Sequence, residues 1–171
     1  MVIQGKHLLI AAGILILLGA VAFGMWYYLR PTDENRIRGQ FRTFSGLAAK
    51  KGNEGLIAAA GTAQAISKLF TDKTTFEVEG LAWDSGLYSR EHIAANVLRG
   101  RAFFDSLQLS FDDIEIEVSG QTARVFNSAV LSGTLRDGKK IREVRDLETI
   151  LKKTGDEWLF DSFKVREIIK K

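Results

Sequence analysis

One stretch of this chain, Leu8 to Leu29, carries no charged side chain, and it constrains the fold more than any other feature. As an α-helix rising about 1.5 Å per residue it would be about 33 Å long, enough to cross a hydrocarbon core of about 30 Å. Three aromatic residues, Trp26 to Tyr28, stand near its end, and Arg30 and Pro31 follow. An aromatic belt, a cation and a helix-breaking proline are typical of a membrane boundary. The sequence therefore predicts a transmembrane anchor at residues 8–29 after a short tail at 1–7.

The same stretch has a second interpretation as a cleaved secretory signal. Ala20-Val21-Ala22 has the small-x-small form that a signal peptidase recognises, and Lys6 supplies a positive charge before the apolar run. Cleavage there would leave Phe23 to Leu29 as an exposed apolar end, so we favour the uncleaved anchor. Both interpretations send the chain to a translocon.

Two signals disagree about the side of the membrane on which the rest of the chain lies. Only Lys6 precedes the apolar run, whereas four arginines follow it within residues 30–42, and the positive-inside rule then places the domain in the cytoplasm. Long domains, however, translocate largely regardless of charge, and a short N-terminal tail is commonly retained inside. We expect a single-pass protein of a bacterial inner membrane with an extracytoplasmic domain.

Composition narrows the possible functions of the remainder, which has about 140 residues, the usual size of one domain. The whole chain has 24 Lys plus Arg and 21 Asp plus Glu, and the two signs are interspersed, which excludes a nucleic-acid-binding surface. It has no cysteine, which excludes disulfides, thiol nucleophiles and thiolate metal sites, and only two histidines. We expect no metal and no cofactor.

Periodicity predicts three helices and five strands after the anchor. The helices span Asp33 to Lys51, Asn53 to Thr71 and Ser89 to about Phe104. A short strand at Thr74 to Glu79 and a turn-rich connection at Leu81 to Tyr88 separate the second and third helices. A meander follows, with strands at Phe111 to Val118, Thr122 to Leu135, Lys140 to Lys152 and Glu157 to Val165. Glycine-containing turns at Ser119-Gly120-Gln121, Asp137-Gly138 and Thr154-Gly155-Asp156 join these strands.

This order of elements resembles the nuclear transport factor 2-like superfamily, which includes ketosteroid isomerase and scytalone dehydratase. The residues that carry the likeness are Ser89-Arg90-Glu91-His92-Ile93, Gly120-x-x-Ala123-x-Val125, Arg145 and the turn from Lys152 to Trp158. The resemblance implies an α+β domain at residues 30–171, a cone of three helices packed on a curved antiparallel sheet. Enzymes, binding domains and assembly subunits share this fold, so the fold does not decide the function.

Candidate catalytic residues are few. Enzymes of the superfamily hold an Asp or His general base in an apolar pocket, and here His92 and Asp84 are the candidates for an acid/base pair. A histidine in the first turn of a helix is more often a surface residue, and Asp84 fits a turn in which its carboxylate bonds local backbone. Phe41 and Phe44 of the first helix neither donate nor titrate.

The candidate ligand-binding residues are Trp83, Asn127, Glu143 and Arg145. Asn127 interrupts an apolar alternation in the second long strand. Glu143 and Arg145 share the alternation of Leu147, so they form a buried ion pair if that face looks inward, or face solvent if the strand carries a bulge.

The sequence favours a membrane-anchored, non-enzymatic domain that binds a protein partner, a second copy of itself or an apolar small molecule at the cell envelope. By architecture alone it resembles the single-anchor bridging subunits of type IV secretion machines. One alternative is a lyase or isomerase that acts on an apolar substrate in the cone. Another is a carrier of lipids or other hydrophobic molecules.

Overall fold

The computed structural model describes residues 18–19, 21, 32–78 and 85–166, and the chain divides into two units, Met1–Thr32 and Asp33–Lys171. The predicted anchor, Leu8 to Leu29, lies outside the described residues apart from Leu18, Gly19 and Val21, which are helical. Within the described part of the chain, no helix combines the length and apolar character that a bilayer crossing requires. The anchor, the cleavage site and the orientation therefore stay predictions.

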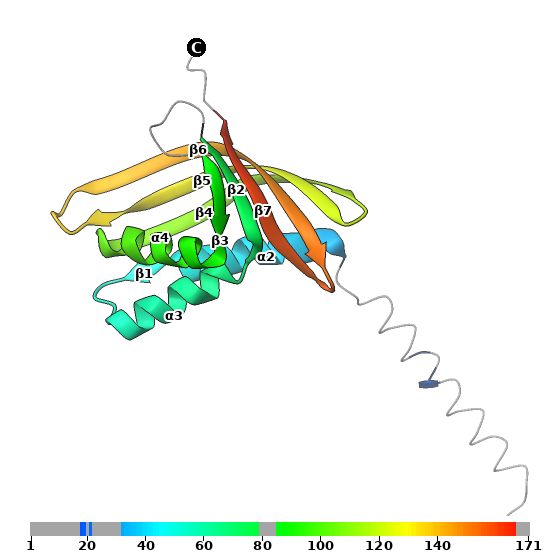
Figure 1. Ribbon diagram of the computed structural model, residues 1–171, viewed down its shortest axis with the longest axis horizontal. Helices are drawn as coiled ribbons and strands as arrows, with labels where there is room; N and C mark the ends of the chain where they lie inside the picture. Colours follow the sequence, from blue (N-terminus) through cyan, green and yellow to red (C-terminus); the bar gives the residue numbers. More distant parts are fainter. Residues whose placement is uncertain (1–17, 20, 22–31, 79–84, 167–171) are drawn as a thin grey trace, which may run out of the picture. The chain divides into compact units, whose positions relative to one another are not determined.

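The described residues of the second unit form three helices and seven strands, labelled in Figure 1. In chain order they are α2 (Asp33–Ala48), β1 (Lys50–Lys51), α3 (Leu56–Ser67), β2 (Phe70–Val78), β3 (Gly86–Ser89), α4 (Arg90–Ala102), β4 (Phe104–Ser119), β5 (Thr122–Leu135), β6 (Lys140–Thr154) and β7 (Glu157–Arg166). The predicted α+β order of three helices, interrupted by a strand and followed by a four-strand meander, is confirmed.

The seven strands form one sheet in the order β1-β4-β5-β6-β7-β2-β3. Every neighbouring pair is antiparallel except β2 and β7, which run parallel. The expectation of an antiparallel sheet is therefore wrong at this one position. Hairpin turns set the direction of consecutive strands only, and β2 and β7 are joined through all the intervening elements, so no local pattern encodes how they pair.

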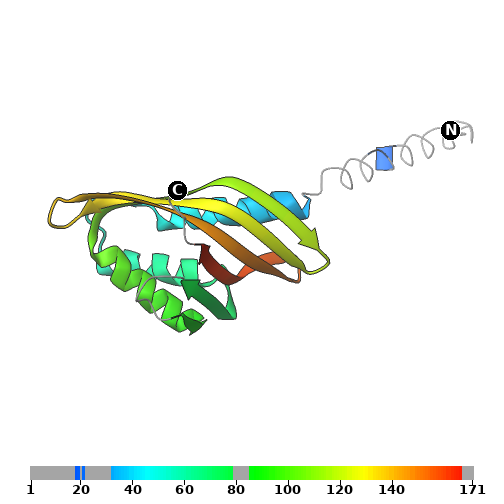
Figure 2. The ribbon, with the colours of Figure 1, turned by 90° about the horizontal axis from the view of Figure 1, so that it is seen from above.

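The core lies between the curved sheet and the helices (Figure 2). α2 contributes Ile37 and Phe41, which are fully buried, because its apolar residues repeat with the helical period. Aromatic rings from the sheet meet them, and the Phe41 ring contacts the Phe160 ring edge to face at 5.0 Å. The rest of the buried cluster is Ile66, Phe70, Ile93, Ala123, Val125, Leu151, Trp158 and Phe163.

β4 is twice as long as predicted. The prediction relied on unbroken alternation of apolar and polar residues, and a β-bulge interrupts that alternation. Its register with β5 shifts between Asp112 and Glu115, and Asp113 takes a positive φ of 52°. The extra residue lets Phe111 and Ile114 both pack against the core, although they are three positions apart. A strictly alternating pattern that starts at Phe111 therefore missed the first half of the strand.

The first helix ends earlier than predicted, since Lys50 and Lys51 form β1 and pair with Leu107 and Ser106 of β4. Lys50 is buried, and its ammonium group donates hydrogen bonds to the backbone oxygens of Arg101 and Phe104. The Lys50 side chain thus caps the end of α4 and not the end of α2, the helix that precedes it.

The other boundaries differ less. α3 is shorter than predicted, β2 is longer, and β3 occupies part of the expected turn-rich connection. Ser89, where the sequence predicted that the third helix begins, is the N-cap of α4, and its hydroxyl accepts a hydrogen bond from the His92 backbone N–H at 3.4 Å. The three predicted hairpins are also confirmed, with positive φ at Gly120, Gly138 and Gly155.

Candidate functional site

Two polar side chains interrupt the apolar inner face of the sheet, Asn127 on β5 and Thr149 on β6. Asn127 follows buried Val125 on the same face of its strand, and Thr149 precedes buried Leu151. Asn127 is paired with Leu147 and Thr149 with Val125, so the two polar residues are diagonal neighbours across adjacent strands.

Both side chains are buried without a hydrogen-bond partner. Asn127 is 5% exposed and Thr149 is fully buried. Within the described part of the chain, neither the oxygen nor the nitrogen of the Asn127 amide is hydrogen-bonded, and neither is the Thr149 hydroxyl. An unsatisfied buried polar group costs about 1–3 kcal/mol, so a sequence that keeps three such atoms together on an apolar face requires an explanation.

Asn127 also lies opposite the bulge in β4. Its neighbours Phe126 and Ser128 pair with Glu115 and Asp112, and the two residues between those positions belong to the bulge. Bulges are over-represented next to functional sites because they bend a strand and redirect its side chains. The backbone irregularity and the unsatisfied amide therefore coincide at one place on the sheet.

Aromatic rings flank this pair of polar residues. Phe163 of β7 lies directly across from Thr149, and its ring stacks on the Phe76 ring at 5.5 Å with an interplanar angle of 6°. The Tyr88 ring meets Phe76 edge to face at 5.4 Å. The arrangement places an amide donor, an amide acceptor and a hydroxyl, all with almost no solvent-accessible surface, beside aromatic rings, and a neutral polar group matches these hydrogen-bonding groups in chemistry.

Asn127 is thus placed on the inner face, as the sequence predicted, whereas the candidate His92 is not brought to it. His92 is exposed on the first turn of α4. Trp83 and Asp84 lie outside the described residues. Phe41 and Phe44 belong to the core, and they pack against other rings.

Glu143 and Arg145 form the expected ion pair, with 2.9 Å between Oε2 and Nη2, but their side chains are 53% and 45% exposed. The buried alternative is therefore wrong. The bulge offered as the reason for exposure is also absent, because the β5–β6 register is unbroken. The pair faces solvent because β7 stops pairing with β6 at Asp146, so this end of the sheet extends beyond its neighbour.

Sequence reasoning missed Thr149 as a candidate, although its pattern contains the signal. Thr149 lies between Leu147 and Leu151 on an alternating apolar stripe, in the same way that Asn127 follows Val125. A single polar residue on such a stripe indicates either a buried hydrogen bond or a binding group.

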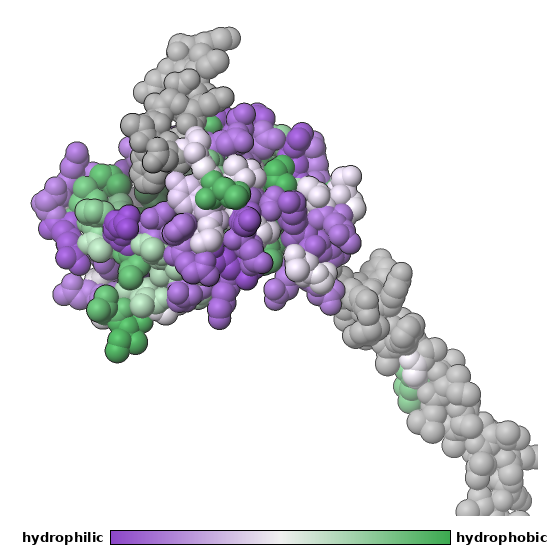
Figure 3. Space-filling view, in the orientation of Figure 1, coloured by the Kyte–Doolittle hydropathy of each residue, from purple (hydrophilic) through white to green (hydrophobic). Residues whose placement is uncertain are grey.

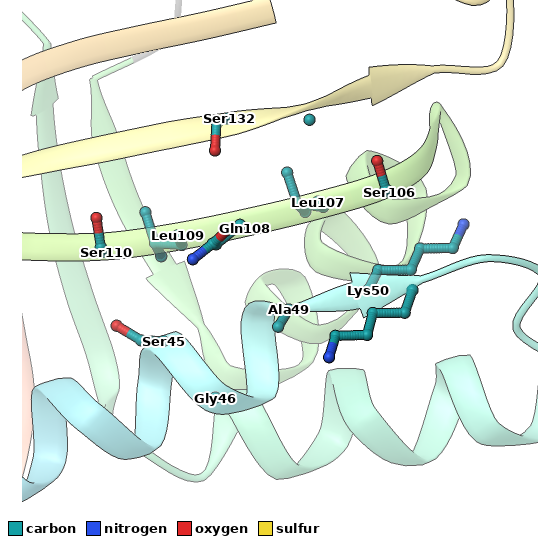
Figure 4. Close-up of a pocket in the computed structure, with 12 residues that line it drawn as sticks. Ser45, Gly46, Ala49, Lys50, Ser106, Leu107, Gln108, Leu109, Ser110 and Ser132 are labelled. Atoms are coloured by element: carbon teal, nitrogen blue, oxygen red, sulfur yellow. The ribbon is translucent and has the colours of Figure 1, made fainter. Parts of the chain in front are cut away.

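Two of the open grooves that the described residues form lie away from this face. The larger, about 670 Å³, runs between the last turn of α2, β1 and the edge of β4, and Figure 4 shows Ser45 and Gly46 on one side and Gln108 on the other. Its lining contains lysine but no carboxylate or imidazole, so it brings no acid/base pair together. Gly133 in this lining is required for close approach, because a Cβ there would lie 2.3 Å from the Ser106 backbone oxygen.

The second groove, about 480 Å³, lies between α3 and α4 and has a mixed lining. Leu56, Ala59 and Leu98 are apolar, whereas Arg99 and Arg136 are cationic. Its one carboxylate belongs to Glu54, which Arg101 holds at 2.9 Å. Among the described residues, no group of three or more His, Asp or Glu side chains lies close enough together to hold a metal ion.

Comparison with known proteins shows what this arrangement is similar to. No family model and no curated protein matches the sequence. An NTF2-like protein with a cystatin-like fold from Novosphingobium aromaticivorans is 19% identical, with a TM-score of 0.60 over 94% of this chain and 90% of that one. The Kfla4162 protein from Kribbella flavida is 14% identical, with a TM-score of 0.65 over 81% and 93%.

A candidate dehydratase of the NTF2-like family from Streptomyces avermitilis is 13% identical, with a TM-score of 0.62 over 81% of this chain and 98% of that one. Identities this low carry no information about activity, but the coverage and the TM-scores agree on architecture. This chain therefore has the NTF2-like, cystatin-like fold, in which three helices pack on a mixed, mostly antiparallel sheet of seven strands.

Proposed function

We propose that this chain is a non-enzymatic binding domain that holds a small, mostly apolar molecule against the inner face of its sheet. One observation carries the proposal, which is the burial of the Asn127 amide and the Thr149 hydroxyl without hydrogen-bond partners among residues 32–78 and 85–166. A ligand that bonded to these atoms would recover the desolvation cost that the free fold bears.

The chemistry of the site defines the ligand class. The amide of Asn127 provides one acceptor and two donors, and the Thr149 hydroxyl provides one of each. Neither group carries charge, and the nearby rings of Phe76 and Phe163 are apolar. The ligand is therefore a neutral molecule with a flat apolar body and a carbonyl, hydroxyl or amide group.

The same residues argue for binding and against turnover. A general base must lie within hydrogen-bond reach of the proton that it removes. Asn127 and Thr149 do not titrate near neutral pH, and the imidazole of His92 is exposed on α4 rather than beside them. The lyase or isomerase alternative therefore receives no support from the described residues.

The cellular setting of the proposal rests on the sequence alone. The uncharged run from Leu8 to Leu29 would tether the domain to a bilayer, and a domain on the outer side of a bacterial inner membrane meets apolar molecules and envelope proteins. We include in the proposal that the ligand-bound domain works beside protein partners at this membrane.

The test compares the full-length wild-type protein with two variants that each carry one substitution. Each protein is extracted gently in detergent and its mass is measured by native mass spectrometry. Asn127→Leu removes the buried amide, and Asn96→Leu makes the same change at an exposed position of α4. We expect wild-type and N96L protein to retain a non-covalent small molecule and N127L protein to lose it. A wild-type protein without any retained molecule, or an N127L protein that retains it equally, would contradict the proposal.

A further inference from the structure

Helix α3 presents an apolar tip to solvent. Leu56 and Ile57, its first two residues, are 76% and 90% exposed, and no residue from Leu56 to Ser67 is charged. Figure 3 shows the corresponding green surface at the lower left of the molecule. Surface helices normally turn charged side chains toward solvent. A helix that has no charged residue and begins with two exposed aliphatic residues is therefore unusual at a solvated surface.

The charges around this tip are predominantly positive. Arg99 and Arg136 line the groove between α3 and α4, and Lys51 lines a smaller groove of about 300 Å³ beside it. Glu54 is the only carboxylate that lines either groove, and the buried Arg101 guanidinium neutralises it. Lys51, Arg99 and Arg136 form no ion pair with any described residue, and an apolar projection with such cations beside it is complementary to a surface that is apolar inside and anionic outside.

We propose that the α3 tip, defined as Leu56, Ile57 and the cations Lys51, Arg99 and Arg136, docks on an anionic lipid bilayer. Leu56 and Ile57 enter the boundary between headgroups and acyl chains, and the arginines bind lipid phosphates. Both aliphatic side chains project outward from the end of a helix, a geometry suited to insertion into a soft surface. The apolar run at Leu8 to Leu29 favours the same occupant, because it would hold the domain near a bilayer.

This inference shares the membrane setting of the proposed function but does not require the ligand on the inner face of the sheet. It is tested with one fluorophore, since the chain has no cysteine and a single introduced one labels a single position. We use full-length protein labelled with an environment-sensitive dye at Ile57→Cys. The control carries the dye at Val118→Cys, an exposed position of the β4–β5 hairpin.

Each protein is reconstituted with vesicles of phosphatidylcholine or of phosphatidylcholine with phosphatidylglycerol, and lipids with brominated acyl chains serve as quenchers. We expect strong quenching at position 57, mainly on the anionic vesicles, and little at position 118. Arg99→Gln with Arg136→Gln should lower the ratio of docked to undocked protein about thirtyfold, because each cation near an anionic surface contributes about fivefold. Arg124→Gln with Arg142→Gln removes equal charge from the other face of the sheet and should leave quenching unchanged.

Four outcomes would overturn the docking proposal. The first two are a dye at position 57 that is not quenched, and a dye that is quenched equally on both kinds of vesicle. The third is an equal loss of quenching in the two double variants. The fourth is a dye that becomes buried without lipid as the protein concentration rises. The last would assign the α3 tip to contact between copies of the chain. Vesicle flotation, measured in parallel, tests the Leu8 to Leu29 tether, and the mass measurement on N127L tests the ligand. Failures of the docking, of the tether and of ligand binding are therefore distinguishable.

Discussion

The buried guanidinium of Arg101 forms an ion pair with the partly buried Glu54, in which Nη2 lies 2.9 Å from Oε2. The same guanidinium donates to the backbone oxygens of Leu47 and Ala48 at 3.0 and 2.7 Å, so it also caps the end of α2. In the opposite direction, the Lys50 ammonium group donates a hydrogen bond to the backbone oxygen of Arg101. The end of α2 is thus capped by a side chain of α4, and the end of α4 is capped by a side chain of β1.

Removing both partners of this pair should cost less stability than the two single removals added together. Arg101→Met leaves the partly buried Glu54 carboxylate unpaired and removes the donor to the backbone oxygens of Leu47, Ala48 and Ala49, so we expect a loss of about 3 kcal/mol. Glu54→Leu combined with Arg101→Met should cost less than the sum of the two single losses. Urea unfolding of the full-length protein in detergent measures both. Arg145→Met serves as the control, because its partner Glu143 is exposed, and it should cost less than about 1 kcal/mol.

The acid sensitivity of the fold should depend on Asp33. Hydrogen bonds from the Lys153 ammonium, at 2.8 Å, and from the Trp158 indole hold the pKa of this carboxyl below its usual 3.8. The unfolded chain then binds the proton more tightly, so the contribution to stability is complete above pH 3.8 and is lost as the pH falls through the lowered pKa.

Asp33→Asn should therefore be less stable than wild type at neutral pH and should lose less stability on acidification below pH 3.8. Asp156→Asn removes a carboxylate whose side chain is 96% exposed and should keep the wild-type profile. Denaturant unfolding across the acid range measures all three proteins. Parallel pH profiles for wild type and D33N would contradict the assignment.

Two glycines should respond to the same substitution with opposite signs. At Gly133 a methyl group would meet the Ser106 backbone oxygen at 2.3 Å, so Gly133→Ala should destabilise the fold by about 1–3 kcal/mol. Gly39 lies inside α2 with open space around it, so Gly39→Ala should stabilise the fold by about 0.5–1 kcal/mol. Thermal unfolding of both variants checks the prediction, which fails if the two melting temperatures move in the same direction.

The features that the sequence predicted correctly are set by residues that lie close together in the chain. The three hairpins were found because Gly120, Gly138 and Gly155 occupy positive-φ positions next to alternating strands. The parallel pairing of β2 with β7 was missed, because two strands distant in the chain leave no joint signal in either one. The bulge at Asp113 was missed too, although the change of parity between Phe111 and Ile114 indicates where it lies.

The candidate site was predictable only in part. Asn127 was identified as a polar residue on an apolar stripe, and Thr149 follows from the same reasoning. The sequence cannot tell whether such a residue finds a partner, because the partner comes from another element. The exposure of Glu143 and Arg145 depended in the same way on where β7 stops pairing with β6.

The central claim is that the Asn127 amide serves a ligand and not the fold, and the unfolding free energy of ligand-free Asn127→Leu tests it most directly. If the amide has no partner in the free protein, its removal relieves a cost of about 1–3 kcal/mol and N127L should be more stable than ligand-free wild type. N127L less stable than wild type by 1 kcal/mol or more would mean that the amide bonds within the fold, and it would contradict the account.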